Sequence, residues 1–149
     1  MECVSSVSYS VSVNRENKGF IKPTRGLRQG NPLSPFLFLI CTEGFSALLN
    51  QAVRQEKLTD LQLSGGGPRL FHLFFLDDSL IFCKAKEKEA VQLMEVLRKY
   101  GDASGQLINT EKSSVFFNKT IQEGERLKVL EKLRGMKVVK QSRYLVYHW

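Results

Sequence analysis

Two adjacent carboxylates lie between two apolar runs in Phe74-Phe75-Leu76-Asp77-Asp78-Ser79-Leu80-Ile81-Phe82-Cys83. The upstream run alternates as a half-buried strand does, and Asp77, Asp78 and Ser79 have the composition of a tight turn, so this stretch is predicted to form a β-hairpin with the acids at its tip. Adjacent Asp residues repel each other and are poor strand formers, so a fold that keeps them at a hairpin tip commonly uses them as ligands for a hard cation such as Mg²⁺. Taken alone, so short a pattern is more often a solvated turn.

Two further blocks of unusual composition flank this hairpin. The upstream block reads Pro23-Thr24-Arg25-Gly26-Leu27-Arg28-Gln29-Gly30-Asn31-Pro32-Leu33-Ser34-Pro35, and the downstream block reads Ser104-Gly105-Gln106-Leu107-Ile108-Asn109-Thr110-Glu111-Lys112-Ser113-Ser114. In this order the three blocks resemble the palm of reverse transcriptases, specifically those of plant non-LTR (LINE-type) retrotransposons. That family's blocks are usually written RGLRQGDPLSP, FADDSLIF and SGQxxNxxKS. The resemblance runs from about Val7 to Tyr144, and residues 145–149 form a divergent C-terminal ending.

The resemblance implies catalytic and metal-binding roles for the hairpin acids. By comparison with the family, Asp77 ligates Mg²⁺ and Asp78 supports the same site, as in two-metal nucleotidyl transfer. Lys112 resembles the family's lysine near the departing pyrophosphate, where an ammonium group could neutralise charge or donate a proton. For Lys112, a solvated surface position is an open alternative. Asn109 is expected to turn the chain ahead of this lysine.

The upstream loop is predicted to bind nucleotide or template if the hairpin is an active site. Gly30 permits close backbone approach, Arg28 can grip a phosphate, and Gln29 can hydrogen-bond a nucleotide or template edge. Otherwise, a Gly- and Pro-rich loop before a helix is an ordinary connection between two elements. RNA template and DNA primer are therefore the partners that the family implies.

The sequence departs from the family at the site that should complete the metal cage. Two-metal chemistry needs a further carboxylate from a separate strand, which in the family precedes the upstream loop. No Asp precedes Asp60, and the only acids before the upstream loop are Glu2 and Glu16. Asn31 replaces the family's usual Asp, and Leu76 replaces its usual Ala. We therefore expect residues 1–149 to be a partial reverse transcriptase (palm) domain without independent polymerase activity.

Composition adds weaker constraints on partner and compartment. The net charge of +7 suits a polyanionic partner such as nucleic acid, although solvated lysines would give the same value. Cys3, Cys41 and Cys83 are odd in number and lack CxxC spacing, which favours a reducing, intracellular location (cytoplasmic or nuclear) over zinc or disulfides. The longest apolar run, Phe36 to Cys41, is too short to span a bilayer, so no membrane contact is expected. The sequence leaves the oligomeric state open.

The expected fold class is α+β, a small antiparallel sheet with helices packed on one face. The expected strands cover Val4–Val13, Phe20–Pro23, both arms of the acidic hairpin and Val115–Phe117, and the expected helices cover Ser34–Gln55, Lys86–Tyr100 and Gln122–Arg134. Ser34 is predicted to cap its helix, and Gly101 to end the second helix. In the last helix, Leu127, Leu130 and Leu133 are predicted to face inward.

Three functional readings follow from the sequence. The first is a reverse transcriptase fragment from a retrotransposon, inactive alone. The second is a basic remnant that binds RNA or DNA without catalysis, which a salt-dependent, sequence-indifferent affinity would support. The third is a degenerate product without function, whose exposed core faces would make it poorly soluble.

Overall fold

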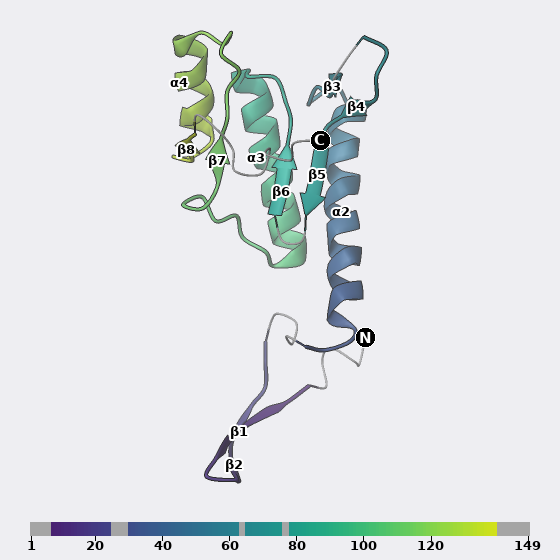
Figure 1. The fold of residues 1–149 in the computed structure, drawn as a ribbon, viewed down its shortest axis with the longest axis vertical. Coiled ribbons are helices and arrows are strands. Elements are labelled where there is room, and N and C mark those ends of the chain that lie inside the picture. Colours follow the sequence, from purple (N-terminus) through teal and green to yellow (C-terminus); the bar gives the residue numbers. More distant parts are fainter. Residues whose placement is uncertain (1–6, 25–29, 63–64, 76–77, 140–149) are drawn as a thin grey trace, which may run out of the picture. The chain divides into compact units, whose positions relative to one another are not determined.

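The computed structural model describes residues 7–24, 30–62, 65–75 and 78–139 of the chain. The chain divides into two compact units, Met1–Cys41 and Thr42–Trp149, and each is described by itself. The elements of both units are labelled in Figure 1.

The first unit contains a hairpin of β1 (Tyr9–Val13) and β2 (Glu16–Ile21), which pair antiparallel. The connection is the two-residue turn Asn14–Arg15, with φ angles of 53° and 67°. Positive φ at both central positions matches the right-handed twist of the strands, and Asn adopts this conformation readily. The strand expected over Phe20–Pro23 therefore starts earlier than predicted, at Glu16, and ends at Ile21.

Helix α2 (Ser34–Arg54) begins at the predicted residue but is capped differently. Asn31 Oδ1 accepts the Leu33 N–H at 3.0 Å, and the Asn31 carbonyl accepts the Ser34 N–H at 3.0 Å. Leu37 N–H then donates to the Leu33 carbonyl, so Ser34 is the first helical residue rather than the cap. Asn31, which the sequence did not mark as a turn residue, therefore turns the chain into the helix.

In length and composition α2 meets the requirements for a helix that crosses a membrane, which the sequence analysis did not expect. The core helix of a soluble protein passes the same test. In its second half, α2 buries Phe45, Leu49 and Ala52 in the protein core.

The strands of the second unit form separate pairs rather than the single sheet that was expected. β3 (Leu61–Gln62) pairs with β4 (Arg69–Leu70), and β5 (His72–Phe75) pairs with β6 (Asp78–Ile81), both antiparallel. Within the described residues, each sheet has two strands. The α+β class is confirmed, and its antiparallel sheets are smaller than the sequence suggested.

Helix α3 (Glu87–Ser104) runs through Gly101, so the prediction that Gly101 ends the helix is wrong. The helix ends at Gly105, which has a φ of 74° and donates its N–H to the Gly101 carbonyl at 2.8 Å. A Cβ on Gly101 would lie 2.8 Å from the Gln106 carbonyl oxygen. Gly101 therefore makes room for the chain as it turns back, while Gly105 supplies the left-handed conformation of the cap.

The last elements are β7 (Ser114–Val115), α4 (Glu123–Lys132) and β8 (Lys137–Val138). β7 and β8 pair parallel, with α4 as the crossover helix that a parallel connection requires. The sequence analysis did not predict β8. The predicted inward position of Leu127 is wrong, because Leu127 is 64% exposed whereas Val129 is buried.

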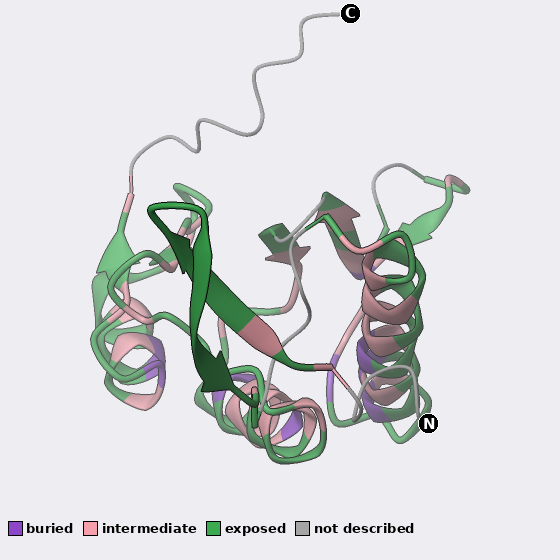
Figure 2. Ribbon diagram, turned by 90° about the horizontal axis from the view of Figure 1, so that it is seen from below, coloured by how far each residue is buried: buried purple, intermediate pink, exposed green. Residues whose placement is uncertain are grey.

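Two apolar clusters meet on α3, and buried residues lie on the facing sides of the helices in Figure 2. The first cluster has the buried residues Phe45, Leu49, Ala52, Leu58, Phe71 and Val96, with Phe74 and Ile81 packed against it. The second has Ala90, Val129 and Leu133, with Val115, Phe117 and Met136 packed against it. α3 thus holds the hairpin side and the α4 side of this unit together.

Candidate active site

The predicted acidic hairpin is confirmed as the β5–β6 pair. The register aligns His72 with Ile81 and Phe75 with Asp78, so Asp78 is the first residue of β6. Asp78 and Ser79 are exposed, as expected for groups at the open end of a hairpin. Leu76 and Asp77 lie outside the described residues.

Three stacked aromatic rings, from α2, α3 and β5, pack against the hairpin. The Phe45 ring of α2 stacks on Phe74 of β5 at 5.4 Å and on Tyr100 of α3 at 4.5 Å, between ring centroids. Such pairs add about 0.5–1.5 kcal/mol each to the burial of their rings. The helices α2 and α3 therefore fix the position of β5 through the Phe45 ring. The strand pattern predicted the apolar character of Phe74, but not its partners.

A hydrogen bond also joins the hairpin to α2. His72 Nε2 lies 2.9 Å from Ser46 Oγ, and the ring is packed against Phe74 at 4.7 Å between centroids. Burial lowers the pKa of His72, and the nearby Glu43 opposes this by raising it. The neutral ring is thus the form that the site favours. No sequence motif marks this contact, because its partners lie 26 positions apart.

The buried carboxylate of Glu89 fixes the far end of β6. Its Oε2 accepts the Lys84 N–H at 3.0 Å and the Thr59 N–H at 3.1 Å, and its Oε1 accepts the Thr59 hydroxyl at 2.8 Å. Burial, followed by the Glu89 charge, raises the pKa of the adjacent Cys83 thiol to about 11. Glu89 is therefore a structural anchor for the segment that leaves the hairpin. The sequence offered no sign of it, since Glu in a first helical turn is ordinary.

The third sequence block forms the reversal after α3. Ser104 Oγ donates to the Tyr100 carbonyl at 2.7 Å and accepts the Gln106 N–H at 3.2 Å. Tyr100 hydroxyl donates to Gln106 Oε1 at 2.9 Å, so the block closes on the helix that precedes it. The Ser-Gly-Gln sequence thus has a structural explanation as a helix C-cap.

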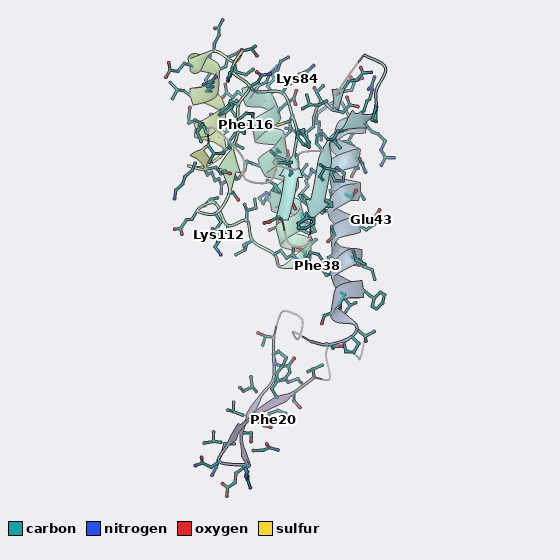
Figure 3. The ribbon with its side chains drawn as sticks, in the orientation of Figure 1. Phe20, Phe38, Glu43, Lys84, Lys112 and Phe116 are labelled. Atoms are coloured by element: carbon teal, nitrogen blue, oxygen red, sulfur yellow. The ribbon has the colours of Figure 1, made fainter. Side chains whose placement is uncertain are left out.

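Lys112 follows a turn that Asn109 makes, as predicted. Asn109 Oδ1 accepts the Lys112 N–H at 3.1 Å, and the Asn109 carbonyl accepts the Ser113 N–H at 2.9 Å. Lys112 is exposed on the loop between α3 and β7 (Figure 3). Among the described residues no hydrogen bond or ion pair joins Lys112 to Asp78. Its predicted role at the pyrophosphate is untested.

The upstream loop is described only in part. Gly30 is exposed and has a φ of 79°, a conformation that favours glycine. Arg28 and Gln29 lie outside the described residues. Gly30 belongs to the first unit and Asp78 to the second, so the geometry between the predicted nucleotide-binding loop and the hairpin is not described.

The described residues do not fit a complete magnesium site. Among them, no group of three or more His, Cys, Asp or Glu side chains is placed to hold a metal ion. Asp78 is the one predicted metal ligand that lies within the described ranges. Glu16, one of the two acids before the upstream loop, is an exposed β2 residue that pairs with Lys18 at 2.8 Å.

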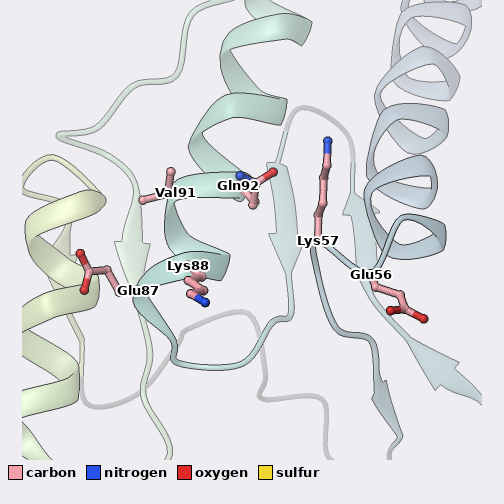
Figure 4. A pocket seen from close by; sticks show the side chains of 6 residues that line it. All are labelled: Glu56, Lys57, Glu87, Lys88, Val91 and Gln92. Carbon is pink, nitrogen blue, oxygen red and sulfur yellow. The ribbon is translucent and has the colours of Figure 1, made fainter.

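A recess of about 520 Å³ lies elsewhere in the second unit, between the chain after α2 and the first turns of α3 (Figure 4). Its lining residues are Glu56, Lys57, Glu87, Lys88, Val91 and Gln92. The carboxylates and ammonium groups balance, and Glu87 is paired with Lys132 at 3.3 Å. None of the predicted site residues lines this recess.

The family described as reverse transcriptase (RNA-dependent DNA polymerase) matches residues 2–148, so the chain belongs to the reverse transcriptase family. The chain is also similar to an uncharacterized mitochondrial protein of Arabidopsis thaliana, with 46% identity over 67 residues. The aligned part is 45% of this chain and 55% of that protein, so the chain spans about half the length of this relative. No solved structure matches significantly.

Proposed function

We propose that this chain is the palm region of a non-LTR retrotransposon reverse transcriptase and acts in RNA-directed DNA synthesis only when another segment supplies a further carboxylate. The observation that carries the proposal is the β5–β6 hairpin, which presents Asp78 at its exposed end. In this proposal Asp77 and Asp78 are the metal ligands, and Lys112 neutralises the departing pyrophosphate.

The β5–β6 sheet has only two strands within the described residues, which supports the proposal that the site needs a further strand. A two-stranded hairpin is marginally stable by itself, and β5–β6 pairs with no other strand within the described residues. An added strand could satisfy an open edge of this pair and carry an acid to the hairpin tip. Glu16 is a poor substitute, since it is exposed on β2 and paired with Lys18.

Primer extension tests the proposal. The purified 149-residue polypeptide should not extend a DNA primer on an RNA template with Mg²⁺ or Mn²⁺. The same polypeptide, fused at Met1 to the acidic upstream strand of an intact reverse transcriptase of the family, should gain activity. Asp77→Asn, or Asn in place of the strand's own Asp, should abolish that gain.

Two outcomes would count against the proposal. Extension by the unfused chain that is lost in Asp77→Asn would mean that the chain completes its own site. Activity of the fusion that survives Asp77→Asn would mean that the hairpin is not the site. Restoring Asn31→Asp in the unfused chain should not produce activity, because Asn31 bonds to the backbone ahead of α2 and the change does not supply the missing strand.

A second function, binding of RNA or DNA without catalysis, is favoured by the net charge of +7. Such binding should be insensitive to sequence and should weaken steeply as salt rises, because it depends on counterion release. Filter binding of single-stranded RNA at increasing salt tests it, with Asp77→Asn as a variant that should bind at least as well. An intracellular location is part of both proposals.

A further inference from the structure

His72 is a polar residue of strand β5 that lies among aromatic side chains of the acidic hairpin. Its ring lies edge-on to Phe71 at 5.9 Å and against Phe74 at 4.7 Å, between centroids, and its β6 neighbour in register is Ile81. Nε2 faces Ser46 Oγ at 2.9 Å. Nδ1 is buried and has no hydrogen-bond partner among the described residues.

The neutral His72 ring is more stable at this position than the protonated ring. Because Nδ1 has no partner, the neutral tautomer that leaves no buried N–H unpaired carries its proton on Nε2 and donates it to Ser46 Oγ, while Nδ1 keeps a lone pair. A second proton would place an N–H on Nδ1 without an acceptor and a positive charge at a partly buried position. Glu43, on the α2 turn before Ser46, is the charged group that acts on the ring, and it offsets only part of the burial. The neighbour in register on β6, Ile81, is uncharged, and the carboxylate of Asp78 belongs to the opposite end of that strand.

We propose that the docking of the His72 ring on Ser46 is a pH-sensitive tether, which holds the acidic hairpin on α2 while the ring is neutral and weakens when protonation leaves a buried Nδ1–H without an acceptor. The proposal rests on the bond, on the buried Nδ1 and on the aromatic surroundings. It concerns the position of the hairpin and does not depend on polymerase activity.

The expected pH dependence follows from the direction of the pKa shift. The pKa of His72 is lowered in the folded chain, so the unfolded or opened state binds more protons below the ordinary value of about 6.5. The tether is therefore complete above that pH and weakens as the pH falls below it.

Amide hydrogen exchange, followed by NMR on the full chain, tests the tether. Protection factors, which correct for the intrinsic pH dependence of exchange, should fall about fivefold for β5 and β6 between pH 7 and pH 5. Those of α4, which packs in the other apolar cluster, should change less than about twofold. In the same samples, the His72 ring should titrate below the ordinary range.

Variants separate the tether from general acid sensitivity. His72→Phe keeps an aromatic ring and should lose the pH dependence of β5 and β6, and Ser46→Ala should lower their protection at pH 7. Glu43→Gln should move the His72 titration to still lower pH, because it removes the charge that favours the protonated ring. A fivefold fall that persists in His72→Phe, or a His72 ring that titrates at or above the ordinary value, would overturn the proposal.

Discussion

The two units of the chain differ in how they use their apolar side chains. In the second unit, Leu49 is completely buried, and every buried core residue lies at Phe45 or beyond. In the described part of the first unit, Phe20 is 77%, Phe36 65% and Ile40 67% exposed. Both units share α2, so the difference does not come from composition or helix propensity. Within the second unit, α3 and the β5–β6 hairpin pack against the apolar face of α2.

This difference implies that the second unit is stable through its own core, whereas the first unit needs contact with another surface to be stable. Burial of apolar area supplies most of the free energy of folding, and the second unit has two clusters that provide it. Within the described residues the first unit buries no comparable cluster, so its hairpin and helix start depend on a covering surface for their stability. An exposed apolar face of this kind is typical of an interaction site.

The largest expected effect is seen when the units are separated. A polypeptide of residues 42–149 should unfold cooperatively in urea, because it keeps both apolar clusters. A peptide of residues 1–41 should show no cooperative transition by circular dichroism, since a lone hairpin and a short helix are marginal in water. Cooperative unfolding of the shorter peptide would remove the contrast between the units.

Two leucines of α2 provide a matched comparison. Leu49→Ala should lower the free energy of unfolding by about 3 kcal/mol, because it opens a cavity in the core. Leu39→Ala, at a position that is 62% exposed, should change it by less than about 0.5 kcal/mol. Urea denaturation of the full chain measures both values. Equal losses would mean that Leu39 is covered in solution.

Two glutamates in the first turn of α3 compare a buried anchor with a surface charge. Glu89→Gln should cost about 2 kcal/mol, because an amide cannot accept all the hydrogen bonds that Thr59 and Lys84 donate. Glu87→Gln breaks only the partly exposed pair with Lys132 and should cost less than about 0.5 kcal/mol. Similar losses in thermal or urea unfolding would show that Glu89 is not an anchor.

The smallest effect concerns the Cys83 thiol. Burial and Glu89 raise its pKa to about 11, so alkylation by iodoacetamide at pH 8 should be about 100-fold slower than for a free thiol. Because the folded chain holds this proton more tightly, its contribution to stability should be lost as the pH rises from about 9 to 11. In a chain that carries Cys3→Ser and Cys41→Ser, Cys83 is the cysteine that reacts. Unfolding this chain in about 8 M urea should restore the alkylation rate of a free thiol.

Local patterns predicted the elements that depend on near neighbours. The alternation around Phe74 gave the hairpin, and the spacing of apolar residues gave three helices to within a few residues at each end. Asn109 was correctly predicted to turn the chain, because an Asn side chain bonds to the backbone just after it. The limits of α3 were less accurate, since Gly101 and Gly105 look alike in sequence. Only the packing of Gln106 against Gly101 distinguishes them.

Contacts between distant residues were not predictable from the sequence. Glu89 accepts from Thr59, 30 positions away, and Ser46 bonds to His72. Neither pair has a local signature, because each forms only after α2, α3 and the hairpin have packed. The structure places the predicted site residues Asp78 and Lys112 at an exposed hairpin end and on an exposed loop, and their roles stay predictions, whereas the residues that position the hairpin came from the structure alone.

The continuity of α2 has a kinetic consequence. Starting a helix is costly because several residues must be ordered for the first hydrogen bond, whereas each further turn is added at little cost. Once Phe45, Leu49 and Ala52 are packed, the second half of α2 can act as a nucleus from which helical turns propagate toward Ser34. The N-terminal turns should then fray first, with amide exchange slowing steadily from Leu37 toward Leu49. A partner that covered the exposed residues would thus gain a helix that is already started.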